Sequence, residues 1–165
     1  MQLRTRQVFT VAAVALGFVV TLAGSAQAQG NSSLGTWTLN VAKSTFDPGP
    51  PPKSEGRVYE AWEGDGIKTT TISVRADGTR SQTAYSAHYD GKDYKYTGSV
   101  GRDGIALKRV DANTTEAVLK KEGKVVQTSR TVIANGGKTM TITGGAGIGR
   151  DGQKTNKTVQ VYEKQ

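Results

Sequence analysis

The sequence contains no cysteine and a single histidine, His88, in 165 residues. Disulfides, thiolate nucleophiles and thiolate metal sites are therefore excluded, and a metal would have to be held almost entirely by carboxylates. No long apolar run follows residue 23, so no membrane-spanning helix is expected beyond that point. We expect neither a metal nor another cofactor.

The one long apolar run of the chain lies near its start. A short basic segment precedes an apolar run over 8–23, and residues 26–28 have the small-x-small pattern of a cleavage site. We therefore expect residues 1–28 to be a secretory signal peptide and residues 29–165 to form a single domain. An uncleaved membrane anchor is the alternative. The expected location is the periplasm or the surrounding medium.

The positive charge of the chain is moderate and dispersed. Lys and Arg number 22 against 14 Asp and Glu, and removal of Arg4 and Arg6 with the leader leaves 20 against 14, a net charge of about +6. The basic residues are spread over every segment and form no run. This pattern favours solubility over nucleic-acid binding, so we expect no nucleic-acid partner.

Seven turn dipeptides recur at nearly regular intervals, with first residues 12, 13, 13, 19, 13 and 16 positions apart. Glycine adopts positive φ without steric cost, and Asp or Asn tolerates the left-handed region beside it, so such pairs predict β-hairpin turns. The pairs are Asp65-Gly66, Asp77-Gly78, Asp90-Gly91, Asp103-Gly104, Glu122-Gly123, Asn135-Gly136 and Asp151-Gly152.

The segments between these turns are rich in Thr, Val, Ile and Tyr, which favour strands, and none has apolar residues at helical spacing. Consecutive hairpins place sequence neighbours side by side. We therefore expect an all-β fold, an up-and-down antiparallel meander of about 8–10 strands closed into a barrel, with a two-sheet sandwich as the alternative. The expected strands are 36–41, 57–63, 67–76, 79–89, 93–100, 105–110, 114–121, 124–134, 138–143 and 154–163.

All four prolines lie within positions 48–52, in the segment 42–56. Proline removes ladder donors and favours an extended chain, so this segment is expected to be a stiff connection or a surface recognition loop. The mature chain has only 31 large apolar or aromatic residues in 137, so many inward positions must be Thr, Ser or Ala. The barrel is therefore either hollow or modestly stable.

Two short motifs resemble those of known barrels. Gly35-Thr36-Trp37 with Leu39-Asn40 resembles the signature that opens the first strand of lipocalins and other calycins, and 161–164 is similar to the last strand of their fatty-acid-binding branch. The resemblance implies a calycin-like barrel in which Trp37 plugs one end. Gln160-Val161-Tyr162 departs from the Arg-x-Tyr of that branch, and the proline segment stands where its lid helices would be.

Eight residues are candidates to line a ligand cavity. Six are aromatic, since an apolar body with a polar tip suits a cavity wall. The other two are arginines that alternation turns inward: Arg130 shares a face with Val126 and Val132, and Arg109 shares one with Leu107. The candidates are Trp37, Tyr59, Trp62, Tyr85, Tyr89, Arg109, Arg130 and Tyr162.

A buried arginine must be paired, which points to an anionic ligand or to an internal carboxylate such as Glu60 or Glu116. The alternative is a register shifted by one, which would place both arginines outside.

Two other features predict no chemistry. His88 has no companion ligands or presented serine, and the glycines at 147, 149 and 152 lack the strand-to-helix context of a dinucleotide fingerprint, so 144–152 is expected to be a rim loop. The sequence thus predicts an exported, non-enzymatic barrel that binds a small, largely apolar or amphipathic molecule. The alternative is a protein-interaction module of the cell envelope that uses its outer surface; the protein partner is unspecified.

Overall fold

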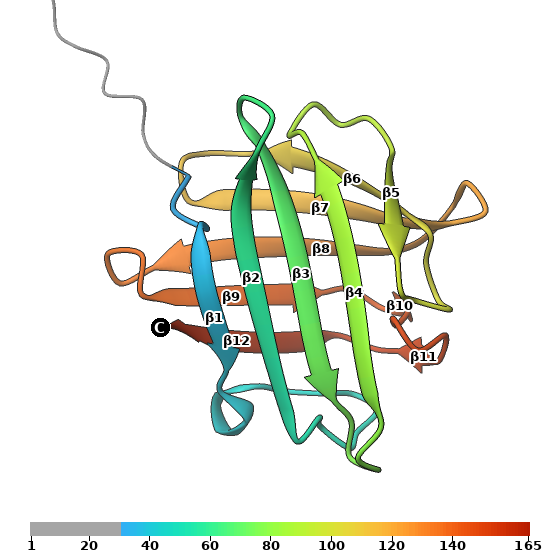
Figure 1. Cartoon of the computed structure of the whole chain (residues 1–165). Coiled ribbons are helices and arrows are strands. Elements are labelled where there is room, and N and C mark those ends of the chain that lie inside the picture. Colours follow the sequence, from blue (N-terminus) through green and yellow to red (C-terminus); the bar gives the residue numbers. More distant parts are fainter. Residues whose placement is uncertain (1–30) are drawn as a thin grey trace, which may run out of the picture.

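Ten strands close into an antiparallel barrel in the computed structural model, which describes residues 31–165 (Figure 1). The expected all-β barrel is confirmed, and the closed ten-strand order fits a calycin-like fold. The barrel strands are β1 (Gly35–Leu39), β2 (Ser54–Trp62), β3 (Gly66–Val74), β4 (Arg80–Ala87), β5 (Tyr94–Thr97), β6 (Gly104–Arg109), β7 (Thr114–Lys121), β8 (Lys124–Ala134), β9 (Thr139–Gly144) and β12 (Thr158–Lys164). The expected signal peptide, 1–28, lies outside the described residues.

Each strand pairs with its neighbours in sequence, and the barrel closes where β1 pairs with β12, with Leu39 opposite Tyr162. Figure 1 shows β2 to β4 forming one wall, crossed behind by β7, β8, β9 and β12. A short hairpin of β10 (Gly147–Ile148) and β11 (Lys154–Thr155) interrupts the last connection. Closure leaves no long unpaired edge among the barrel strands, as expected for a meander of this length.

Most of the turn dipeptides occupy turns, and two do not. Glu122 and Gly123, with φ of 51° and 75°, form the two-residue loop between β7 and β8. Gly66 and Gly104 instead begin strands. Position 66 has no room for a side chain, because a Cβ on Gly66 would lie 2.5 Å from the carbonyl oxygen of Trp62. The preceding turn uses Gly64, with φ of 70°.

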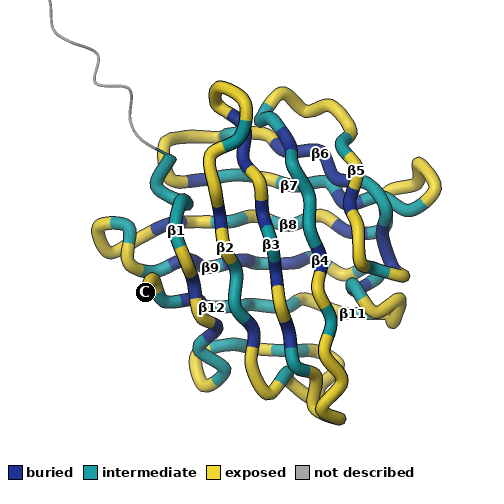
Figure 2. Tube along the Cα trace, in the orientation of Figure 1, coloured by how far each residue is buried: buried dark blue, intermediate teal, exposed yellow. Residues whose placement is uncertain are grey.

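Small and hydroxyl side chains fill many inward positions, as the composition predicted. Along β3, Thr69, Thr71 and Ser73 are buried on the inner face, while the residues between them are more exposed (Figure 2). Large apolar side chains gather in a single core cluster that includes Ile67, Met140 and Tyr162. The inward side chains are therefore short over much of the barrel wall.

One end of the barrel is closed by the segment that precedes β1. Trp37 is fully buried there, and its Nε1 donates to the carbonyl oxygen of Ser33 at 2.7 Å. Leu34 packs against the core, and the Asn31 amide donates to the Tyr89 hydroxyl at 3.0 Å. Trp37 thus sits where the lipocalin resemblance implied a plug.

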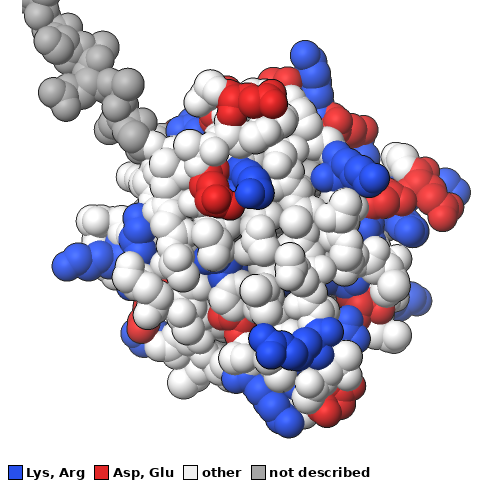
Figure 3. Space-filling view, in the orientation of Figure 1, with Lys and Arg blue, Asp and Glu red and all other residues white. Residues whose placement is uncertain are grey.

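The proline segment is a connection, as expected. A 3₁₀ turn, η1 (Val41–Lys43), follows β1, and β2 begins only at Ser54. No helix in residues 31–165 has the length and apolar character needed to cross a membrane. On the outer face seen in Figure 3, basic and acidic side chains are interspersed and lie mostly toward the periphery.

Candidate ligand-binding cavity

The barrel encloses a cavity of about 510 Å³. Its apolar wall comes from β3, β6, β7 and β9 and includes Ile67, Leu107, Leu119 and Ile142. Hydroxyl and amide side chains supply much of the remaining lining: Ser73, Ser81, Thr83, Thr115, Gln127, Ser129, Thr131, Thr155, Thr158 and Gln160. The inner surface is therefore mixed in polarity.

Solvent reaches the cavity where its lining residues are exposed. These residues lie in four connections: the proline segment, the β3–β4 turn, the β5–β6 connection and the glycine-rich segment that carries β10 and β11. They are Pro48, Pro50, Arg75, Ala76, Asp77, Gly98 and Asp151. The glycine-rich segment is thus a rim element, as its sequence predicted, and the proline segment belongs to the same opening.

Three of the six aromatic candidates, Tyr59, Tyr85 and Tyr89, line the cavity. Tyr162 is fully buried in the barrel wall and reaches the cavity lining through a hydrogen bond described below. Trp37 belongs to the closed end. Trp62 does not line the cavity, because it packs against His88 with ring centroids 4.8 Å apart.

Arg130 points away from the cavity, so its inward assignment is wrong. Its side chain is 50% exposed and pairs with Glu116, also 50% exposed, at 2.8 Å. The cause is a β-bulge: Leu119 pairs with Gln127, but Lys120 pairs with Val125, so one residue of β8 is extra and the alternation changes beyond it. The inner face of β8 is therefore Gln127, Ser129, Thr131 and Ile133.

Arg109 keeps the face that alternation predicted, shared with Leu107, but does not line the cavity. Its guanidinium carbon lies 4.2 Å from the ring centroid of Tyr89 and covers that ring. Glu60, one of the two carboxylates proposed as an internal partner, pairs with Lys68 on the exposed surface at 3.1 Å. Neither proposed carboxylate is internal.

The internal carboxylate is Glu55, which is 2% exposed at the start of β2. Its Oε1 accepts from the Tyr162 hydroxyl at 2.5 Å and from Arg57 Nε and Nη2 at 3.3 Å, while its Oε2 accepts from Arg150 Nη2. Arg57 Nε also donates to the Tyr162 hydroxyl oxygen at 3.0 Å. We call Glu55, Arg57, Arg150 and Tyr162 the Glu55 cluster.

Charge and burial together set the ionisation of this cluster. Burial opposes ionisation of Glu55, but Arg150 and Arg57 outweigh it and hold the pKa of the carboxyl at about 2. Burial raises the pKa of Tyr162 well above its usual value, so this hydroxyl stays neutral and donates. The carboxylate is therefore ionised and hydrogen-bonded on both oxygens, which is how a buried charge is tolerated.

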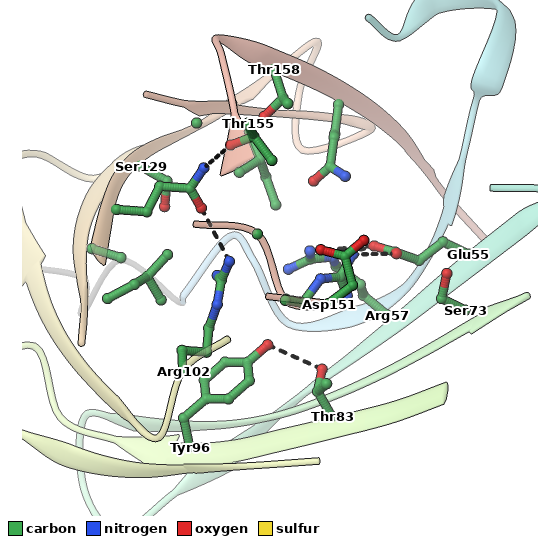
Figure 4. Close-up of a pocket in the computed structure, with 18 of the residues that line it drawn as sticks. Glu55, Arg57, Ser73, Thr83, Tyr96, Arg102, Ser129, Asp151, Thr155 and Thr158 are labelled. Carbon is green, nitrogen blue, oxygen red and sulfur yellow. Dashed lines mark hydrogen bonds and ion pairs between the residues drawn. The ribbon is translucent and has the colours of Figure 1, made fainter. Parts of the chain in front are cut away.

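Arg102, in the β5–β6 connection, reaches the cavity apart from this cluster (Figure 4). Its Nη2 donates to Gln127 Oε1 and to the Ile148 carbonyl oxygen, each at 3.1 Å. Its guanidinium carbon lies 5.8 Å from the Tyr96 ring centroid, and the Tyr96 hydroxyl donates to Thr83 Oγ1 at 3.1 Å. Arg57, Arg150 and Arg102 thus bring three buried or half-buried guanidinium groups to an interior in which Glu55 is the buried carboxylate, so the interior is positive.

The residues that give the cavity its charge were not among the sequence candidates. A signal did exist in β2, because Glu55, Arg57 and Tyr59 are spaced two residues apart and therefore share one face of the strand. It was missed because the prolines nearby led us to expect the strand to start at residue 57. Arg102 and Arg150 lie in connections, where no periodicity indicates direction. Their roles depend on contacts across the barrel.

No protein-family model matches this sequence. No curated protein is similar enough in sequence to match it. Among solved structures, the tryptamine complex of the amine binding protein of Rhodnius prolixus is similar, at 13% identity and a TM-score of 0.42. The match covers 80% of this chain and 64% of that one, so the chain spans less than two thirds of that protein. A likeness of this size says nothing about the ligand of this chain.

Proposed function

We propose that this protein binds a small amphipathic molecule inside its barrel and releases it unchanged. The observation that carries the proposal is the cavity of about 510 Å³ within a closed barrel. Well-packed interiors leave few voids larger than a water molecule, whereas ligand sites typically measure about 300–1,000 Å³. A space of this size that opens to solvent between surface connections is what a binding protein requires.

The lining refines the ligand expected from sequence. Ile67, Leu107, Leu119 and Ile142 offer an apolar wall, and tyrosine rings extend it. The hydroxyls and the Glu55 cluster make the remainder polar, and such groups lower binding unless the ligand satisfies them. An amphipathic molecule therefore fits better than the largely apolar one that the composition suggested.

Binding without reaction is part of the proposal. His88 is not a lining residue, and its Nδ1 lies 3.2 Å from Asp65 Oδ1 at the surface. Glu55 is bound on both oxygens and its pKa is about 2, so it is a poor proton acceptor near neutral pH. Within residues 31–165, neither His88 nor Glu55 is therefore placed and charged to activate a nucleophile of the lining.

We also propose that the protein is exported to the periplasm or the medium. Support comes from the basic start, the apolar run over 8–23 and the cleavage pattern at 26–28. Amino-terminal sequencing of the protein from its native cells should give a chain that begins at Gln29. An intact chain that begins at Met1 in the membrane fraction would contradict export by cleavage.

The binding proposal can be tested by filling the cavity from one strand. Ser129→Phe places a ring inward from β8, whereas Thr128→Phe places the same ring on the outer face and serves as the control. With the neutral probe N-phenyl-1-naphthylamine, Ser129→Phe should weaken binding at least ten-fold and Thr128→Phe should leave it unchanged. Equal affinities for the two variants, or no binding to the wild type, would overturn the proposal.

A further inference from the structure

Arg102 is held firmly but is not neutralised. Arg102 is 6% exposed, and its guanidinium Nη2 donates to two uncharged oxygens, those of Gln127 and Ile148. Its Nε is buried without a hydrogen-bond partner. A guanidinium has five N–H donors, so most of this donor capacity is unused. Buried polar groups are ordinarily satisfied, which makes this one an exception that calls for an acceptor.

No carboxylate within residues 31–165 forms an ion pair with Arg102. Glu55 is engaged by Arg57 and Arg150. Asp151, exposed at the mouth, accepts from the backbone N–H of Gln153 at 3.1 Å. The charge of Arg102 is therefore not paired with any carboxylate of the described cavity wall, although Asp151 at the mouth acts on it from a distance.

The surroundings of Arg102 work against its charge. Burial, together with the positive charges of Arg150 and Arg57, lowers its pKa to about 10 against the opposing effects of Tyr96 and Asp151, and the group remains protonated near neutral pH. An anion in the cavity would relieve both effects at once. It would supply an acceptor and neutralise part of the excess positive charge.

We propose that Arg102 is the anion-binding residue of the cavity and that the ligand is an organic acid whose carboxylate pairs with this guanidinium while its apolar body lies along Leu107 and Leu119. The inference rests on the proposed function and names the ligand class. The guanidinium is held in place before the ligand enters by its contacts with Gln127 and Ile148 and by the Tyr96 ring beside it. Because the group is already ordered, less entropy is lost on binding.

The test uses three probes that share one ring and differ in charge: 1-naphthylacetate, 1-naphthylacetamide and 2-(1-naphthyl)ethylamine. Isothermal titration of the mature wild-type chain should show the acid binding at least ten-fold more tightly than the amide, with the amine weakest, because a charge-assisted hydrogen bond replaces a neutral one. An amide that binds as tightly as the acid would overturn the inference.

Variants then assign the preference to one residue. Arg102→Gln should lower the affinity for the acid at least ten-fold and leave that for the amide unchanged, while Arg102→Lys should retain part of the preference. Arg130→Gln removes the same charge from the outer surface and should retain all of it. An equal loss in Arg102→Gln and Arg130→Gln would overturn the inference, since net charge alone would then explain it.

The outcomes separate this inference from the proposed function. Binding of all three probes with equal affinity would refute the anion site and leave the cavity-binding proposal standing. Failure of every probe to bind the wild type would refute both. If Arg102→Gln does not fold, as judged by circular dichroism, the comparison of the three probes on the wild type decides the question by itself.

Discussion

The arginines that reach the cavity differ in their partners: Arg57 and Arg150 have a buried carboxylate beside them, and Arg102 does not. Arg57 and Arg150 share a buried carboxylate, and Arg57 also donates to the Tyr162 hydroxyl, so each of these two arginines has an anionic partner within the fold. Arg102 receives only neutral acceptors. The difference indicates that the Glu55 cluster stabilises the barrel, while Arg102 holds a positive charge that the fold itself does not need.

This contrast has an energetic meaning. Breaking a buried ion pair by removing one partner is costly, because it leaves the other charge uncompensated. An unpaired buried charge such as that of Arg102 lowers the stability of the folded state. A ligand site explains why such a charge is present, since functional sites commonly retain local destabilisation. The two groups should therefore respond differently to substitution, and that difference can be measured.

The largest effect is expected at Glu55. Glu55→Gln leaves Arg57 and Arg150 without a counter-charge and should lower the free energy of unfolding by about 3 to 5 kcal/mol, as measured by urea denaturation. The control is Glu116→Gln, which breaks the exposed pair with Arg130 and should cost less than about 1 kcal/mol. Similar losses for the two variants would refute the stabilising role of the cluster.

Lowering the pH should destabilise the protein for the same reason as Glu55→Gln does. The pKa of Glu55 falls from 4.5 to about 2 on folding, so the carboxyl contributes stability that is present above about pH 5 and is lost as the pH falls toward 2. The interval between the two pKa values corresponds to about 3 kcal/mol. Unfolding free energies measured between pH 6 and pH 2 should show this loss in the wild type and a smaller one in Glu55→Gln. Parallel profiles would contradict it.

A smaller effect is expected at Tyr162. Tyr162→Phe removes the hydroxyl that donates to Glu55 at 2.5 Å and accepts from Arg57 at 3.0 Å, while the ring remains. Hydrogen bonds to charged groups contribute about 1.5–3 kcal/mol, so a loss of about 2 kcal/mol is expected in thermal or urea unfolding. An unchanged midpoint would show that Arg57 and Arg150 suffice to satisfy the carboxylate.

The smallest effect is expected at Arg102. Arg102→Met removes an uncompensated buried charge together with two hydrogen bonds from Nη2, and these opposing terms should leave the free energy of unfolding within about 1 kcal/mol of wild type. The measurement is again urea denaturation. A loss as large as that in Glu55→Gln would mean that Arg102 is a structural clamp between β8 and the β10 segment.

The strands were predictable because hairpin neighbours are also sequence neighbours. The expected ranges 114–121 and 124–134 coincide with β7 and β8, and the turn between them was placed at the correct dipeptide. Tyr59 and Tyr85 line the cavity on the inner faces of β2 and β4, where alternation holds, and Tyr89 lines it from just beyond the end of β4. The prediction failed at Arg130, where a bulge in β8 changes the alternation without any mark in the sequence.

The sequence by itself determined a meander of hairpins with a wall of short polar side chains, because turn chemistry and two-residue periodicity are local properties. Only the tertiary structure decided which charges meet inside. Arg150 reaches Glu55 across 95 residues and Tyr162 reaches it across 107, and such contacts exist only once the barrel has closed. Closure also left Arg102 without an ion-pair partner, because the atoms that it bonds across the barrel are the Gln127 amide oxygen and the Ile148 carbonyl oxygen rather than a carboxylate.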